Sequence, residues 1–195
     1  KAIADFSEAI RRDSQQAAYY QSRGLARALK GDHREAIADF NQAMVRMPRN
    51  AFFYFSRGRS RYKLGEYGSA IADFQQAIRI NSRYAKAYDG VAWIQATCPD
   101  DAYADGRQAV ANATRACELA DWKDSVYIAT LAAAYAESGD FEQAQQNLSR
   151  AVKMSPDAYK AKRTKMAELF AAQEPYRESP PSPTQQTNAT RRPTS

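Results

Sequence analysis

Aromatic and basic side chains recur at helical spacing between residues 52 and 63. They are three or four positions apart, which places them along one side of a helix: Phe52, Phe55, Arg59 and Tyr62, with Lys63 beside them. Rings supply apolar area that a ligand can bury, and cations supply charge-assisted hydrogen bonds to carboxylates. The pattern predicts a surface for a protein or peptide segment that is acidic or ends in a carboxylate.

A second set of the same kind consists of Lys86, Asp89 and Trp93. Each ring in the two sets has an alternative role, because aromatic side chains often fill the space between helices instead of facing a ligand. For Phe52 and Trp93 the two roles are about equally favoured. The four aromatic residues 52–55 are consecutive, and successive side chains of a helix point about 100° apart. At least one of these four is therefore expected to be exposed.

Residue types suited to catalysis or metal binding are sparse. The one histidine, His33, falls in a predicted turn without a nucleophile at a useful spacing, so a solvated imidazole is expected. Cys98 and Cys117 are too few for a structural zinc site, and helical spacing separates them by about 20 Å, beyond the reach of a disulfide. We therefore expect free thiols, no cofactor, no metal and no enzymatic activity.

Charge is distributed unevenly along the 195 residues. Residues 1–97 carry 16 Lys and Arg against 9 Asp and Glu, whereas residues 98–157 carry 5 against 10. No run of about 18 apolar residues could cross a membrane, and the first residues do not resemble a signal peptide. The composition is that of a soluble helical protein. It leaves the compartment open, with the cytoplasm slightly favoured.

Four arginines recur at equal spacing and could form a basic ladder for nucleic acid. They are Arg23, Arg27, Arg57 and Arg61. Asp39 and Asp73 recur with the same period, so each arginine can instead pack its stem between helices and pair with a carboxylate. The combined aromatic and basic pattern of a known nucleic-acid module is absent. Nucleic acid is therefore disfavoured as a partner.

A repeated pentapeptide indicates the elements that position these residues. The sequence Ala-Ile-Ala-Asp-Phe begins at Ala2, Ala36 and Ala70, so each copy follows the last by 34 residues. A fixed period of this length is typical of stacked units of two antiparallel helices. Small residues let the paired helices approach closely, while Phe40 and Tyr20 fill the space beside them. The period predicts an all-α fold of stacked helical hairpins.

The residues around each copy resemble the tetratricopeptide-repeat family in its bacterial form. In the second helix of a unit, the family's Ala, Phe, Ala and Pro are matched by Ala36, Phe40, Ala43 and Pro48. In the first helix, its Gly and large aromatic residue are present, and its Leu and Tyr are Arg in two units. The resemblance implies a right-handed superhelical solenoid whose concave groove is lined by the first helices. It also implies a scaffold or adaptor that binds peptides there, with the two sets of aromatic and charged residues facing the groove.

The spacing also divides the chain. We expect an array over residues 1–173, made of a half repeat, four hairpins and a capping helix: 1–16, 17–50, 51–84, 85–124, 125–157 and 158–173. The third hairpin has 40 residues, and its extra residues fall in an acidic turn near 97–106. Residues 174–195 are rich in Pro, Ser and Thr, which predicts a disordered tail. Because a half repeat leaves its apolar side uncovered, we expect this segment to be cut from a longer array.

Two alternatives to the adaptor remain open. The chain could be a structural module that self-associates through its aromatic-rich helix or its uncovered end. It could also be the regulatory arm of a larger polypeptide that carries an enzyme elsewhere.

Overall fold

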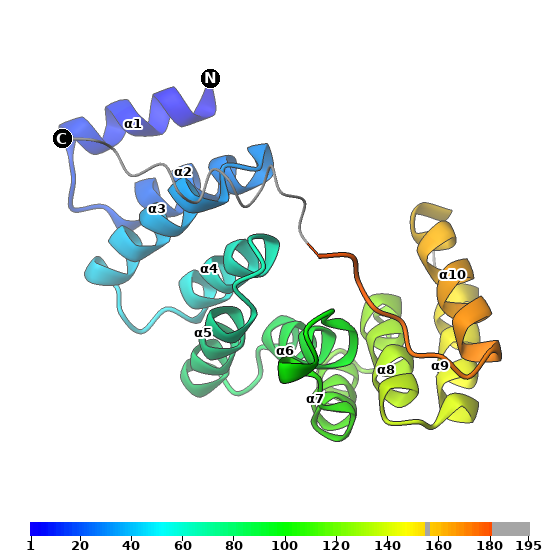
Figure 1. The fold of residues 1–195 in the computed structure, drawn as a ribbon. Helices are drawn as coiled ribbons and strands as arrows, with labels where there is room; N and C mark the ends of the chain where they lie inside the picture. Colours follow the sequence, from blue (N-terminus) through cyan, green and yellow to red (C-terminus); the bar gives the residue numbers. More distant parts are fainter. Residues whose placement is uncertain (155–156, 181–195) are drawn as a thin grey trace. The chain divides into compact units, whose positions relative to one another are not determined.

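The computed structural model describes residues 1–154 and 157–180, which form helical hairpins (Figure 1). The described residues contain ten α-helices and two short 3-10 helices, and no strand. The expected all-α repeat architecture is confirmed. Contacts divide the chain into two compact units, which we call the first unit (residues 1–82) and the second unit (residues 83–179) and describe separately.

The first unit is a single helix followed by two hairpins. The single helix is α1 (Ala2–Arg12), and the hairpins pair α2 (Ala17–Lys30) with α3 (His33–Arg46) and α4 (Ala51–Lys63) with α5 (Tyr67–Ile80). Gly31 and Gly65 turn the two hairpins with φ angles of 93° and 78°. Side chains disfavour this left-handed conformation, so glycine sets where each first helix stops.

Close packing within each hairpin depends on a second glycine. A Cβ atom on Gly24 would lie 3.0 Å from the ring of Phe40, and one on Gly58 would lie 2.8 Å from the ring of Phe74. Both phenylalanines belong to the repeated pentapeptide and are buried. In each hairpin the phenylalanine ring of the second helix therefore packs directly against a glycine of the first helix.

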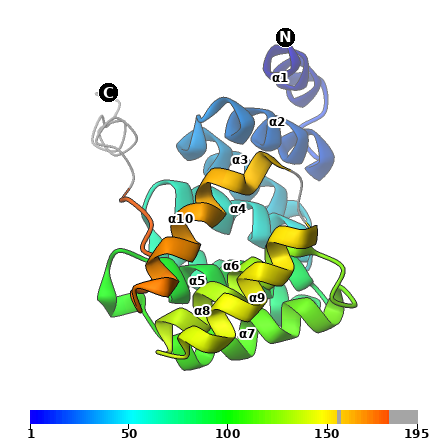
Figure 2. The ribbon, with the colours of Figure 1, turned by 90° about the vertical axis from the view of Figure 1, so that its right-hand side faces the viewer.

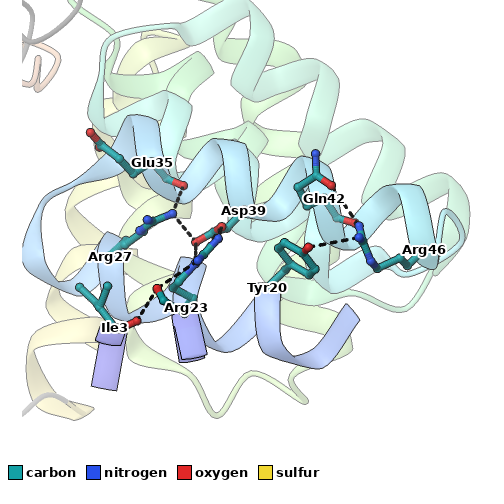
Figure 3. Close-up of polar contacts among 9 residues, drawn as sticks. Ile3, Tyr20, Arg23, Arg27, Glu35, Asp39, Gln42 and Arg46 are labelled. Carbon is teal, nitrogen blue, oxygen red and sulfur yellow. Dashed lines mark hydrogen bonds and ion pairs between the residues drawn. The ribbon is translucent and has the colours of Figure 1, made fainter. Parts of the chain in front are cut away.

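Each hairpin of the first unit also buries a carboxylate between two arginines, as Figure 3 shows for Asp39. Asp39 Oδ1 lies 2.6 Å from Arg23 Nη2, and Oδ2 lies 2.7 Å from Arg27 Nη1. The next hairpin repeats the cluster at 2.6 and 2.8 Å with Arg57, Arg61 and Asp73. The arginines thus pair with the aspartates that recur at the same period. Each carboxylate offsets one of the two positive charges of its cluster and holds both guanidinium groups inside the fold, which argues against a basic ladder for nucleic acid.

The second unit contains two hairpins and a last helix (Figure 2). The hairpins pair α6 (Ala85–Thr97) with α7 (Gly106–Leu119) and α8 (Ser125–Glu137) with α9 (Phe141–Met154), and α10 (Lys160–Ala171) packs on α9. The 3-10 helix η1 (Asp101–Tyr103) lies in the acidic turn, and η2 (Asp157–Tyr159) precedes α10. Helix α8 is buried along most of its length because α6, α7 and α9 all contact it.

The chain beyond α10 differs from the expected tail. Residues 174–179, which we call the strap, are extended and bound to α6, α8 and α10. The prediction of disorder from residue 174 was therefore wrong for these residues. Tyr176, Arg177 and Glu178 each have a partner in the second unit, and composition does not reveal such partners. The rest of the predicted tail, residues 181–195, lies outside the described residues.

Both cysteines are buried and free, as the spacing predicted. Burial raises the pKa of the Cys98 thiol, and it raises the pKa of Cys117 to about 12. Since the thiolate is the nucleophilic form, both side chains are unreactive at neutral pH. Across the described residues, no helix combines the length and the apolar character that crossing a membrane requires.

Candidate functional site

A hollow of about 270 Å³ opens among α2, α3 and α4 of the first unit. Helices α2 and α4 are the first helices of their hairpins, which the family resemblance predicts to line the groove. The wall is apolar on the α2 side and carries polar and cationic groups from α4 and the start of α3. The lining residues are Leu25, Ala28, Leu29, His33, Phe40, Ser56, Arg59, Ser60 and Lys63.

Arg59 and Lys63 supply the positive charge of the hollow. They are four residues apart on α4, and both are exposed. In the part of the chain that the structure describes, the ion pairs of α4 belong to Arg57 and Arg61, and neither Arg59 nor Lys63 joins one. The two cations of the hollow are therefore available to an anionic group, unlike the arginines of the buried clusters.

Two buried polar atoms belong to residues of the same wall. Ser60 is 2% exposed, and its Oγ has no hydrogen-bond partner among residues 1–154 and 157–180. Nδ1 of His33 is likewise buried and unpaired within those residues. A buried polar group without a partner costs about 1–3 kcal/mol. A ligand oxygen that reached Ser60 would remove this penalty, so the wall is suited to a polar ligand.

The sequence predicted a solvated imidazole at His33, but the structure places this side chain half-buried in the hollow. The residue begins α3 and lines the hollow instead of standing free in the turn. Burial lowers the pKa of His33, and the positive charges of Lys63 and Arg59 lower it further. The imidazole therefore reports on the charge inside the hollow.

Replacing both Arg59 and Lys63 with Ala should raise the pKa of His33 toward its ordinary value of about 6.5. Two positive charges near an imidazole disfavour its protonation, and the double variant removes both. Because the chain has one histidine, the Cε1 proton gives a single NMR signal to titrate. Arg79→Ala, which removes an exposed cation outside the hollow, should leave the titration unchanged. An unchanged pKa in the double variant would contradict this electrostatic account.

Of the five partner-binding residues predicted in the first unit, Arg59 and Lys63 line the hollow and three rings do not. Phe55 is 8% exposed and packs with its ring centroid 5.7 Å from that of Phe74 on α5. Tyr62 is half-buried, with its ring 6.0 Å from the ring of Tyr67. Phe52 is half-buried against the core cluster that contains Tyr20, Met44 and Phe53.

The expectation that one of the residues 52–55 would be exposed was wrong. Phe53 and Phe55 are buried, and Phe52 and Tyr54 are half-buried. Neighbours on both sides of α4 cover these rings. Phe52, Phe53 and Tyr54 pack in the core cluster with residues of α2 and α3, and Phe55 packs on α5. The rings support the position of α4, and Arg59 and Lys63 of the same helix line the hollow.

The three residues predicted in the second unit have different surroundings. Lys86 is exposed on α6. Asp89 is half-buried, and burial raises its pKa to about 6. Trp93 lies with its ring centroid 6.1 Å from that of Tyr176 in the strap, and Lys162 Nζ is 3.9 Å from the Trp93 centroid. Trp93 is therefore engaged by a segment of its own chain.

Sequence reasoning did not select Leu29, His33 or Ser60 as binding residues. Leu25 and Leu29 do show a signal, because they are four residues apart and share a side of α2. Leu29 is 90% exposed, which is unusual for a leucine beside a hollow and suits an apolar contact with a ligand. Ser60 and His33 offer no comparable pattern, since their roles depend on the approach of α3 to α4.

Comparisons with known proteins agree with the helical repeat. A tetratricopeptide-repeat model matches residues 51–84, and a second model of the same repeat matches residues 1–52 and 130–164. The sequence matches no curated protein. The chain resembles the crystal structure of MamA at 19% identity and a TM-score of 0.68, over 82% of this chain and 89% of MamA.

Two further solved structures are similar. YrrB, described as a TPR protein with an unusual peptide-binding site, is 21% identical with a TM-score of 0.66, over 84% of this chain and 81% of YrrB. A thermophilic TPR protein of Thermus thermophilus, TTC0263, is 16% identical with a TM-score of 0.64, over 88% of each chain. At these identities the likeness extends to the fold and no further.

Proposed function

Because this chain belongs to the tetratricopeptide-repeat family, we propose that it is a protein-binding scaffold whose hollow among α2, α3 and α4 holds an acidic segment of a partner. The observation that carries the proposal is the pair Arg59 and Lys63, two exposed cations without an ion pair in the described chain. Carboxylates form charge-assisted hydrogen bonds with such cations. The buried hydroxyl of Ser60 adds a donor in the same wall.

The size and the wall of the hollow indicate the kind of segment. Pockets for drug-sized molecules measure about 300–1,000 Å³, so 270 Å³ is suited to one or two side chains of a longer segment. Leu25 and Leu29 offer apolar contact opposite the cations. A segment that places a small apolar residue next to Asp, Glu or a terminal carboxylate would satisfy both sides.

Long-range charge favours the same class of partner. Residues 1–82 carry 14 Lys and Arg against 8 Asp and Glu. Asp39 and Asp73 offset two of the four positive charges of their arginines, so the field around the first unit remains positive. A net positive field accelerates the association of acidic partners and weakens as salt is added.

Selection from a phage-displayed library of random peptides tests the proposal on the full chain. The native chain should enrich peptides in which an acidic residue adjoins an apolar one, and Arg59→Glu/Lys63→Glu should not. Arg49→Glu/Arg79→Glu makes the same change of charge at exposed positions outside the hollow and should select as the native chain does. No enrichment on the native chain, or equal enrichment on the Arg59 and Lys63 variant, would refute the site.

A further inference from the structure

The strap binds the second unit mainly through one aromatic anchor. Tyr176 is 9% exposed, and its ring lies beside Trp93 of α6. The ammonium of Lys162 is 3.9 Å from the centroid of Trp93 and 5.5 Å from that of Tyr176. The cation near two rings and the contact between the rings are both attractive. This anchor has the composition of a peptide-binding hot spot.

The next two strap residues make polar contacts at the ends of α6 and α8. Arg177 forms a two-point ion pair with Glu137, in which Nη2 lies 2.8 Å from Oε1 and Nη1 contacts Oε2. Its Nη1 also lies 3.3 Å from the carbonyl oxygen of Ala96, and the Glu178 amide donates to the carbonyl of Thr97 at 2.8 Å. These carbonyls end α6, where the helix dipole favours a cation.

Glu178 of the strap forms an ion pair with a lysine of α10. A carboxylate oxygen of Glu178 lies 2.8 Å from Nζ of Lys162, the lysine that also contacts the two rings. The enlarged turn after α6 contributes Asp101, whose Oδ1 is 3.7 Å from Arg177. The extra residues of the third hairpin thus lie beside the strap, and they add negative charge where its arginine binds.

The geometry of the strap is that of a bound peptide. Residues 174–179 form no helix, and the strap runs from the end of α10 back across α8 (Figure 1). Gln173 turns the chain at this point with φ of 58°. The contacted groups Trp93, Glu137 and Lys162 come from α6, α8 and α10; α8 contacts both of the other helices, and Tyr176 of the strap packs into the core cluster that they share. Side chains of these three helices therefore make up the face that the strap covers.

We propose that this face is a second peptide-binding groove, that it takes extended segments in which an aromatic residue is followed by Arg and an acidic residue, and that the strap is its intramolecular occupant. When the strap lifts, Glu137 loses its guanidinium partner and Trp93 loses its ring contact. Each loss favours rebinding of the same residue types, either from the strap or from another protein. The groove is distinct from the hollow of the first unit and uses none of its residues.

Competition between the strap and an external segment is measurable. A short tether gives the strap an effective concentration of the order of millimolar, which weakens the apparent affinity of any external segment. The probe is a fluorescein-labelled peptide with the sequence of residues 172–180, and the readout is fluorescence anisotropy. Full chains carrying Tyr176→Ala/Arg177→Ala should bind this peptide at least about tenfold more tightly than the native chain.

Three controls make the test specific. A peptide with the same two alanines should not bind, and adding Trp93→Ala to the loosened chain should weaken binding by about tenfold or more. Glu174→Ala/Ser179→Ala changes two exposed strap residues and should bind the peptide as weakly as the native chain does. Equal binding by the native and loosened chains, or binding by neither, would overturn the proposal. Loss of the circular-dichroism helix signal in the loosened chain would also overturn it, because the strap would then be part of the core.

Discussion

Replacing Asp39 with Ala should lower the free energy of unfolding by about 3 kcal/mol, the scale measured when one partner of a buried ion pair is removed. The carboxylate is 2% exposed, and its oxygens receive Arg23 and Arg27 at 2.6 and 2.7 Å. Its loss leaves two guanidinium groups, each mostly buried, without an anion. Arg23 also contacts Ser7 Oγ at 3.0 Å, so α1 should loosen as well. Urea unfolding followed by circular dichroism measures the change.

The repeat provides matched controls for this prediction. Asp5 occupies the same place in the first pentapeptide but is exposed, so Asp5→Ala should cost less than about 1 kcal/mol. Asp73 is buried between Arg57 and Arg61, and Asp73→Ala should resemble Asp39→Ala. Equal effects at Asp5 and Asp39 would show that the buried clusters do not stabilise the hairpins in the way described.

Gly106→Ala should destabilise the second unit by at least about 2 kcal/mol, because the new methyl group overlaps backbone that cannot rotate away. An ideal Cβ at this position would lie 2.5 Å from the amide nitrogen of Ser138 and 2.7 Å from the carbonyl carbon of Glu137. Alanine is intrinsically favoured over glycine in a helix by about 1 kcal/mol. This gain offsets part of the steric cost, so the steric cost is larger than the measured loss of stability. The melting temperature should fall by several degrees, measured by differential scanning calorimetry.

Gly24→Ala is the comparison for this steric argument. Its Cβ would meet the side chains of Phe40 and Asp39 at 3.0 and 3.2 Å, and side chains can shift by a few tenths of an ångström. The loss at Gly24 should therefore be smaller than at Gly106. A reversed order would mean that the ends of α7 and α8 are less closely held than the structure shows.

The features that the sequence predicted correctly have local or periodic causes. The period of 34 residues predicts helical hairpins, because each copy carries the same ring and the same small residues. Gly31 and Gly65 mark their turns through a conformation that glycine alone adopts freely. The recurrence of Asp39 and Asp73 at the same interval as the arginines also predicted their pairing.

The features that were missed depend on residues far apart in the chain. Phe55 is buried because Phe74 of the next helix packs on it. The spacing of residues within one helix cannot predict a contact with another helix. Arg177 is ordered by Glu137, 40 residues earlier, so a segment with the composition of a disordered tail is held in place. The hollow likewise forms where three helices meet, and its Ser60 has no sequence signature.

A charge-exchange binding experiment tests the central claim, that Arg59 and Lys63 bind the acidic groups of a partner in the hollow of the first unit. Two labelled heptapeptides serve as probes, one with a Leu-Asp-Leu-Glu core and the other with a Leu-Lys-Leu-Lys core, and anisotropy gives the Kd of each. The native full chain should prefer the acidic peptide at least about tenfold, a difference of about 1.4 kcal/mol, and Arg59→Glu/Lys63→Glu should prefer the basic one. The same preference in both chains would contradict the account.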